Sequence, residues 1–281
     1  MKPLTASPRM SPRRLAATGA VALVTVALTV ATAPATFARG GGHHRAKPTV
    51  VLVHGAWADA SSWSGVIERL QHDGYPVRAL ANPLRSLSGD AASVRSYLDT
   101  QTGPIVLVGH SYGGAVITNA ATGDSHVRAL VYVDAFAPDE GQAVAPLAGA
   151  DSALADPTAA FNAVPATLPP TSSTELYLKT STFLSAFANG VPVREARMLA
   201  ASQRPVTAGA LNEPSGAPAW RTIPSWFLIG TRDRVITPNA ERAMAEHAGA
   251  RISYFTAGHL GLISDPAAVT RIIERAAEAT A

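Results

Sequence analysis

The sequence contains no cysteine, and only 15% of its residues are charged. The missing cysteine excludes disulfide bonds, a thiolate nucleophile, cysteine-ligated zinc and lipidation at a thiol. Aromatic residues are also scarce, at 6%, whereas 47% of the 281 residues are hydrophobic. A chain of this length and composition buries one sizeable core, and we expect one domain with an inserted segment rather than two independent domains.

Acidic residues are absent from the first 38 positions, which carry four basic residues. Residues 15–33 form an uncharged run, and small residues follow it up to Ala38. This order is typical of a secretory signal peptide, and we expect cleavage after Ala38 or Ala35 and a secreted protein. The Arg13-Arg14 pair leaves both the general and the twin-arginine export routes open. An uncleaved membrane anchor is the alternative, because the apolar run is long.

Removal of residues 1–38 changes the formal net charge from +3 to −1, because it removes basic residues only. The mature chain therefore gives no reason to expect a nucleic-acid partner or stable membrane association. Residues 39–47, "RGGGHHRAK", are predicted to form a flexible linker, with His43 and His44 solvated rather than metal-bound. The sequence does not indicate an oligomeric state.

From residue 48 to the end, apolar strand patterns alternate with helical patterns. Val-rich runs ended by glycine or polar residues predict six strands, at 49–55, 75–82, 104–110, 127–136, 225–233 and 251–259. Such alternation predicts an α/β fold, a mostly parallel sheet with helices on both faces. Residues 139–218 interrupt it after the fourth strand, and we expect a helical cap there, with helices near 173–190 and 192–203.

The stretch "VLVGHSYGG" places Ser111 in a Gly-x-Ser-x-Gly motif between a predicted strand and a predicted helix. That context is typical of a sharp turn that exposes a nucleophilic serine at the edge of a sheet. A glycine-rich turn with an incidental serine is the alternative. The strand-to-helix placement favours the nucleophile.

A serine hydroxyl needs a base and an acid that orients the base. His259 ends the last predicted strand, and Asp233 follows the strand before it. The carboxyl ends of parallel strands meet at one sheet edge, so we expect both residues to lie near Ser111. Asp134, which also ends a strand, is the alternative acid.

Backbone N–H groups are expected to stabilise the developing oxyanion. The predicted donors are Tyr112, which follows the nucleophile, and Ala56 in the loop after the first strand, with Trp57 as the next candidate. His54 is expected to fix that loop rather than act as a second base. The remaining histidines outside the linker are expected to be structural or exposed: His72, His110, His126 and His247.

The motifs "VLVHGAW", "VLVGHSYGG", "IGTRDRVITP" and "AGHLGLISDP" make residues 48–280 resemble the α/β-hydrolase superfamily. The resemblance is to the branch of small esterases with plant methyl-ester hydrolases and hydroxynitrile lyases, and to bacterial hydrolases of secondary metabolism. It implies a Ser111–Asp233–His259 triad, an oxyanion hole at Ala56 and Tyr112, and neither a metal nor an organic cofactor. Hydroxynitrile lyases carry a threonine at the position of Gly55 and a lysine at that of Leu260, so these departures favour hydrolysis.

We therefore expect a secreted serine hydrolase that cleaves a small, neutral ester or lactone. A slowly turning-over, receptor-like binding protein and a cofactor-free lyase or perhydrolase remain the alternatives. An apolar pocket suits such a substrate, and six residues are candidates for its wall: Trp57, Phe136, Tyr177, Phe183, Phe187 and Met198.

Overall fold

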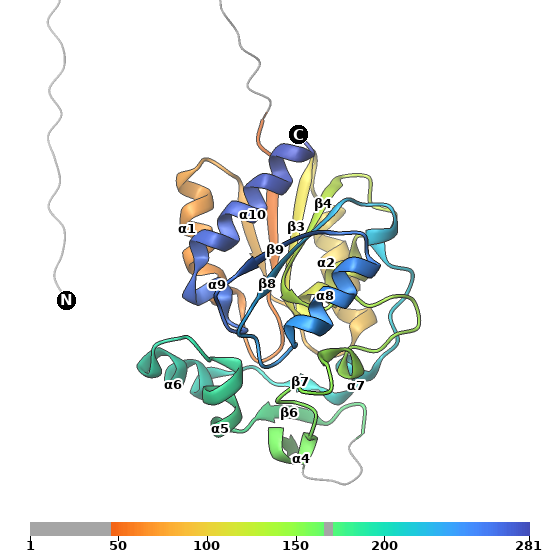
Figure 1. Ribbon diagram of the computed structural model, residues 1–281. Helices are drawn as coiled ribbons and strands as arrows, with labels where there is room; N and C mark the ends of the chain where they lie inside the picture. The colour runs from red at the N-terminus through yellow and green to blue at the C-terminus, as the bar shows by residue number, and fades with distance from the viewer. Residues whose placement is uncertain (1–45, 166–170) are drawn as a thin grey trace, which may run out of the picture. The chain divides into compact units, whose positions relative to one another are not determined.

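The computed structural model describes residues 46–165 and 171–281. Its main element is a six-stranded parallel sheet with the order β2-β1-β3-β4-β8-β9 (Figure 1). The strands are β1 (Thr49–Val53), β2 (Val77–Leu80), β3 (Ile105–Ser111), β4 (Val127–Ala135), β8 (Ser225–Gly230) and β9 (Arg251–Phe255). All six lie within the ranges predicted from the sequence except that β3 extends to Ser111. The predicted signal peptide and most of the predicted linker lie outside the described residues.

The central strands are almost completely buried because helices cover both faces of the sheet. Every residue of β3 and β8 is buried, and these strands are rich in Val, Ile and Leu. A strand buried on both faces has no polar alternation, which is why continuous apolar runs predicted these strands. The parallel arrangement brings the carboxyl ends of β1, β3, β4, β8 and β9 to the same edge.

The helices fall into two groups. One group is α1 (Ser64–His72), which packs against α10 (Pro266–Ala279), and α10 also contacts β3 and β4. The other group includes α2 (Leu87–Leu98), packed against α3 (Tyr112–Ala120), and α8 (Pro238–His247), which packs on β8. Figure 1 shows α1 and α10 together, away from α2 and α8. The short helices η1 (Ala60–Trp63) and α9 (Gly261–Ser264) also contact α1 or its neighbours.

The inserted segment lies beyond the carboxyl edge of the sheet, and the expectation of a helical cap is only partly right. Its helical turns are η2 (Ala145–Ala148), α4 (Pro157–Ala160), α5 (Thr180–Thr182), the π-helical η3 (Phe183–Phe187), α6 (Val193–Ser202) and α7 (Ala208–Asn212). The turn η4 (Ala219–Arg221) follows the segment and leads into β8. It also contains a three-stranded antiparallel sheet of β5 (Phe161–Val164), β6 (Glu175–Leu178) and β7 (Val206–Thr207). The prediction of a helix at 173–190 is therefore wrong for Glu175–Leu178, which form β6. The helix predicted at 192–203 is present as α6.

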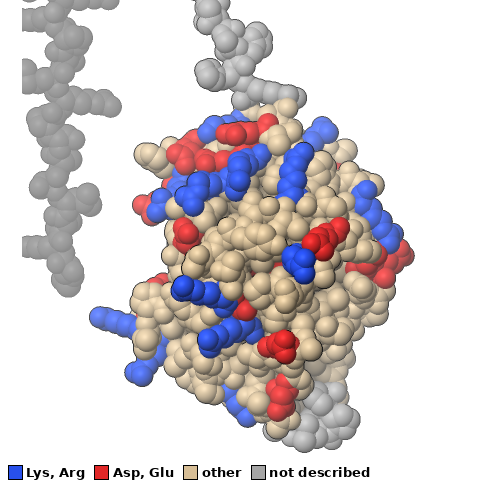
Figure 2. Space-filling model, in the orientation of Figure 1, with Lys and Arg blue, Asp and Glu red and all other residues tan. Residues whose placement is uncertain are grey.

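Charged groups of both signs are distributed over the described surface. Figure 2 shows acidic and basic side chains interspersed on the face that carries α1 and α10. This mixture gives no broad field of one sign on that face. Within residues 46–165 and 171–281, no helix combines the length and apolar character required to cross a bilayer.

Candidate active site

Ser111 occupies a strained turn between β3 and α3. Its backbone has φ 52° and ψ −126°, a conformation that L-residues rarely adopt. Close packing around the turn requires glycine, because a Cβ on Gly109 would approach the Gly113 carbonyl oxygen to 2.6 Å, and one on Gly113 would approach the Val53 oxygen to 2.4 Å. The turn therefore has the geometry that the Gly-x-Ser-x-Gly motif predicted.

Ser111, His259 and Asp233 form one hydrogen-bonded chain. The Ser111 Oγ lies 2.9 Å from His259 Nε2, and His259 Nδ1 lies 2.7 Å from Asp233 Oδ2. Ser111 is 1%, Asp233 5% and His259 0% exposed. The arrangement matches the one in which a histidine withdraws the serine proton while a carboxylate holds the imidazole.

Asp233, rather than Asp134, contacts the histidine. Asp233 Oδ1 accepts hydrogen bonds from the N–H groups of Val235 and Ile236, at 2.6 and 3.1 Å, which leaves Oδ2 to face His259. Asp134 Oδ1 instead accepts from the Gly230 N–H at 2.7 Å. Burial, and then the neighbouring charge of Asp233, raise the pKa of Asp134 well above its ordinary value.

Two further histidines hold the backbone of the site. His110 Nε2 lies 2.9 Å from the carbonyl oxygen of His259, so His110 ties the nucleophile turn to the loop of the base. Burial, and then the proximity of His259, lower the pKa of His110 well below its ordinary value, which keeps it neutral. The sequence indicated a structural role for His110 but not its partner.

His54 fixes the loop after β1, as expected. Its Nδ1 contacts the Gly55 carbonyl oxygen at 2.8 Å, and its Nε2 accepts the Asn82 N–H at 3.0 Å. Burial lowers the pKa of His54 to about 4. Of the histidines expected to be exposed or structural, His72, His126 and His247 are exposed, the last beside Asp139 at 2.8 Å.

The residues whose N–H groups are expected to stabilise an oxyanion, Ala56 and Tyr112, line the same cavity as Ser111. Tyr112 is the first residue of α3, so its N–H has no acceptor within the helix. The Ala56 N–H makes no hydrogen bond within the described residues. By contrast, the Trp57 N–H donates to the Arg204 carbonyl oxygen at 3.1 Å, which favours Ala56 over Trp57 as the second donor.

The side chain of Tyr112 anchors this turn from behind. Its hydroxyl donates to Asp90 Oδ2 at 2.8 Å, and both residues are buried. Burial, and then the Asp90 charge, raise the pKa of the Tyr112 phenol well above its ordinary value, so it remains a donor. The hydrogen bond links α3 to α2 directly beneath the nucleophile.

Ser111 faces a cavity of about 340 Å³ between the sheet and the cap. Trp57 and Phe136 line it, as the sequence predicted. Four other predicted wall residues do not: Tyr177, Phe183, Phe187 and Met198. Phe183 and Phe187 are buried in the core with ring centroids 4.8 Å apart, whereas Met198 is 62% exposed on α6.

Most of the cavity wall was not predicted. Ala56, Trp57, Ser111, Tyr112 and Phe136 were predicted to lie at the site. The other lining residues are Val144, Ala145, Ala148, Leu154, Pro157, Phe161, Leu176, Ala208, Leu211, Asn212 and Val235. They are mainly small or aliphatic residues of the cap. Their sequence shows no periodicity that distinguishes a pocket wall from ordinary core packing.

Trp57 connects the cavity to the cap. Its backbone has φ 57°, and its indole N–H donates to the Leu176 carbonyl oxygen in β6 at 2.8 Å. The ring stacks on Phe161 with centroids 5.6 Å apart and meets Phe187 edge-on at 5.8 Å. The side chain of Trp57 therefore joins the loop after β1 to the antiparallel sheet of the cap, β5-β6-β7.

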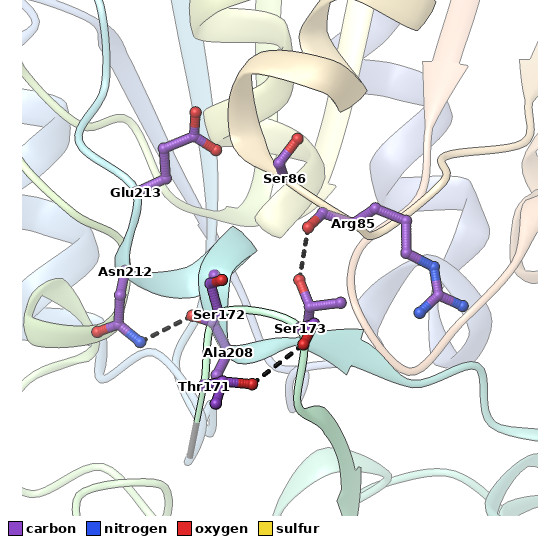
Figure 3. A pocket seen from close by; sticks show the side chains of 10 residues that line it. Arg85, Ser86, Thr171, Ser172, Ser173, Ala208, Asn212 and Glu213 are labelled. Carbon is purple, nitrogen blue, oxygen red and sulfur yellow. Dashed lines mark hydrogen bonds between the residues drawn. The ribbon is translucent and has the colours of Figure 1, made fainter. Parts of the chain in front are cut away.

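A second, more open hollow of about 820 Å³ lies on the other side of α7 (Figure 3). It shares Ala208 and Asn212 with the cavity at Ser111 but contains none of the three hydrogen-bonded residues. Its polar groups largely bond to the protein itself: the Thr207 hydroxyl donates to the Arg85 oxygen at 2.6 Å, and the Asn212 amide to the Ala208 oxygen at 2.8 Å. The smaller cavity, which contains Ser111, is therefore the candidate active site.

One group of side chains among the described residues has the donors for a metal ion. Carboxylate oxygens of Asp134, Asp233 and Glu241 lie within 4.8 Å of one another. Asp233 already accepts three hydrogen bonds, including that of His259. A cation there would compete with His259 for the same carboxylate, so the group fits the triad better than it fits a metal.

Comparison with known proteins agrees with this geometry. Residues 50–272 match the model of the alpha/beta hydrolase family. A carbendazim hydrolyzing esterase of Nocardioides sp. (strain SG-4G) is 33% identical over 107 residues, which is 34% of this chain and 44% of that protein. The chain thus matches less than half the length of this curated relative.

Solved structures share the fold. An extracellular α/β-hydrolase from a Paenibacillus species, described as sharing structural and functional homology with tobacco salicylic acid binding protein 2, has a TM-score of 0.70 at 23% identity, covering 82% of this chain and 99% of that one. Polyneuridine aldehyde esterase has a TM-score of 0.70 at 17% identity, covering 82% and 98%. With the family match over most of its length, the chain belongs to the alpha/beta hydrolase family.

Proposed function

We propose that this protein is a serine hydrolase that cleaves small, uncharged carboxylic esters or lactones through an acyl-enzyme at Ser111. The observation that carries the proposal is the hydrogen-bonded chain from Ser111 through His259 to Asp233, at 2.9 and 2.7 Å. The name of the Nocardioides relative, a hydrolyzing esterase, supports the same class of reaction.

In the proposed mechanism, Ser111 Oγ attacks the substrate carbonyl while His259 Nε2 accepts the serine proton. Asp233 holds the imidazole and stabilises its charged form. The N–H groups of Ala56 and Tyr112 stabilise the tetrahedral oxyanion. His259 then returns the proton to the leaving alcohol, and water hydrolyses the acyl-enzyme by the same route.

The cavity supports a modest, apolar substrate. Its volume of about 340 Å³ is near the lower end of small-molecule sites. The side-chain hydroxyl of Ser111 and the amide of Asn212 are polar groups on its wall, whereas the polar ends of Tyr112 and Trp57 bond to Asp90 and Leu176. Among the described residues, no charged side chain lines the cavity. A charged acyl group would lose its hydration there without gaining a partner, so neutral esters are favoured.

Hydrolysis is favoured over cyanohydrin cleavage by the space around Gly55 and Leu260. A Cβ on Gly55 would approach the Ser111 Cβ to 2.6 Å, so a threonine at that position does not fit without rearrangement. Leu260 is 2% exposed, which leaves an apolar side chain where the lyases carry lysine.

The test is steady-state hydrolysis of p-nitrophenyl acetate, butyrate and octanoate by the wild type, Ser111→Ala and Ser202→Ala. Ser202 lies on the exposed side of α6 and is the matched control. We expect turnover by wild type and Ser202→Ala, a loss of at least about 1000-fold in Ser111→Ala, and a preference for the shorter esters. A single stoichiometric burst without turnover would favour the receptor-like alternative.

We also propose that the protein is exported. The basic start, the uncharged run 15–33 and the small residues before Arg39 support this. The test is the intact mass of protein recovered from the medium of an expressing culture. The expected chain begins at Arg39 or Thr36, and a cell-retained chain beginning at Met1 would contradict export.

A further inference from the structure

Three carboxyl groups are buried together behind His259. Asp134 ends β4, Asp233 follows β8 and Glu241 lies on α8, and one oxygen from each lies within 4.8 Å of the other two. Asp134 and Glu241 are 0% exposed. Among the described residues no lysine or arginine pairs with any of the three, and the ion pair of this group is that of Asp233 with His259.

The hydrogen bonds distinguish the three groups. Asp233 accepts from His259, Val235 and Ile236, as an ionised carboxylate does. Asp134 accepts the Gly230 N–H through Oδ1, and among the described residues its Oδ2 meets no well-aligned donor, although the Gly261 N–H lies near the group. Among the described residues, neither oxygen of Glu241 meets a well-aligned donor, although the Ala135 N–H and the Asp233 carboxylate lie near it.

A buried ionised carboxylate without donors is strongly unfavourable, whereas a protonated one gains an O–H donor. The acceptors that the cluster offers to such a donor are the oxygens of the other two acids. Burial, and then the charges of Asp134 and Asp233, raise the pKa of Glu241 well above its ordinary range. Burial and mutual repulsion therefore favour a single negative charge among the three adjacent carboxyl groups, and Asp233 has the donors to hold it.

We propose that Glu241 is a positioning residue that stays protonated and donates a hydrogen bond to the Asp233 carboxylate, fixing that carboxylate for His259. The inference rests on the proposed role of Asp233 in a hydrolytic triad. Asp134 is the second neutral acid, and it ties the end of β4 to β8 through Gly230. The hydrogen bond disperses the charge of Asp233 and limits its rotation, so that Oδ2 keeps facing the imidazole.

Two substitutions of Glu241 distinguish a protonated side chain from an ionised one. Glu241→Gln keeps the size, the neutrality and a donor, so we expect kcat within about threefold of wild type and an unchanged pH profile of kcat/KM. Glu241→Met keeps much of the volume without a donor, so we expect kcat to fall about tenfold with KM unchanged. Rescue by glutamine but not methionine supports the hydrogen bond.

If Glu241 were ionised, Glu241→Gln would remove a negative charge beside the His259–Asp233 pair. That loss disfavours the protonated histidine, so the acid limb of the pH profile would shift to lower pH by about one unit. Such a shift, or a Glu241→Met variant with wild-type kcat, would overturn the proposal. Thermal unfolding of each variant shows whether it is folded before its rate is interpreted.

Infrared difference spectroscopy tests the protonation without any turnover. We expect wild type at pH 7 to show a protonated-carboxyl C=O band that Glu241→Gln lacks, whether or not Glu241→Met folds. Absence of that band would overturn the proposal, as would one equivalent of divalent metal bound by wild type and lost in Glu241→Gln. If the band is present but esters are not cleaved, the proposed function fails while the protonation of Glu241 stands.

Discussion

Replacing Asp233 by asparagine is the sharpest perturbation of the proposed triad, because the change adds one N–H₂ group and removes one charge. The aspartate uses Oδ1 for the Val235 and Ile236 N–H groups and Oδ2 for His259. Asparagine has one acceptor oxygen. Placing it toward the two backbone N–H groups preserves two hydrogen bonds, so its N–H₂ group faces His259 Nδ1.

That orientation forces the wrong tautomer on the histidine. With Nδ1 accepting a hydrogen bond, the neutral imidazole carries its proton on Nε2, the atom 2.9 Å from Ser111 Oγ. Nε2 then has no lone pair with which to accept the serine proton. In serine proteases this substitution lowers kcat about 10⁴-fold, which corresponds to about 5.5 kcal/mol in activation free energy, and we expect a similar loss here.

The assay is kcat for p-nitrophenyl acetate, with Asp134→Asn as the matched control. Burial and the nearby charge of Asp233 favour the neutral form of Asp134, and asparagine preserves its bond from the Gly230 N–H, so we expect kcat within about fivefold of wild type. The proposed role of Asp233 is refuted if Asp233→Asn keeps more than a tenth of wild-type activity. It is also refuted if Asp134→Asn is the less active of the two.

Three predictions concern folding. Gly113→Ala places a Cβ 2.4 Å from the Val53 oxygen, so we expect at least about 2 kcal/mol of destabilisation by urea unfolding, and wild-type stability would contradict the close packing. Phe183→Ala should cost about 3 to 5 kcal/mol and the exposed Met198→Ala less than about 0.5 kcal/mol, whereas equal effects would contradict their different burial. The unfolded chain protonates His54 near its ordinary pKa and the folded chain at about 4, so the stabilising contribution is complete above about pH 6.5 and decreases as the pH falls toward 4. His54→Gln should lose that pH dependence, up to about 3 kcal/mol, and an unchanged slope of unfolding free energy against pH would contradict it.

The sheet could be predicted from the sequence because its strands are buried on both faces. Runs such as Ile105–Ser111 are apolar throughout and end at glycine or a polar residue, which makes them visible without tertiary information. The nucleophile turn was also predictable, because only small residues satisfy its close contacts. The proximity of Ser111, Asp233 and His259 was then predictable, because all three lie at the carboxyl ends of parallel strands, which meet at one edge of the sheet.

The cap was less predictable because its structure depends on distant pairing. Glu175–Leu178 becomes a strand through β5 and β7, and the same residues fit a helical pattern equally well when considered alone. The cavity wall is built from small aliphatic residues on several loops, which no local pattern identifies. The expected aromatic wall was therefore only partly right.

Glu241 shows a different limit of sequence reasoning. It lies in the first turn of α8, where an acidic residue is ordinary at a helix N-terminus. Only the three-dimensional packing of α8 against β8 shows that this side chain is buried beside two other acids. Asp134 was recognised as a candidate acid, but its raised pKa depends on its burial and on the nearby charge of Asp233.

The most direct test of the central claim is intact-mass analysis after treatment with a fluorophosphonate, which reacts with activated serines. We expect a single adduct on the folded wild-type protein and none on Ser111→Ala under the same conditions. Folded wild-type protein without an adduct, or an equal adduct on Ser111→Ala, would contradict an activated Ser111.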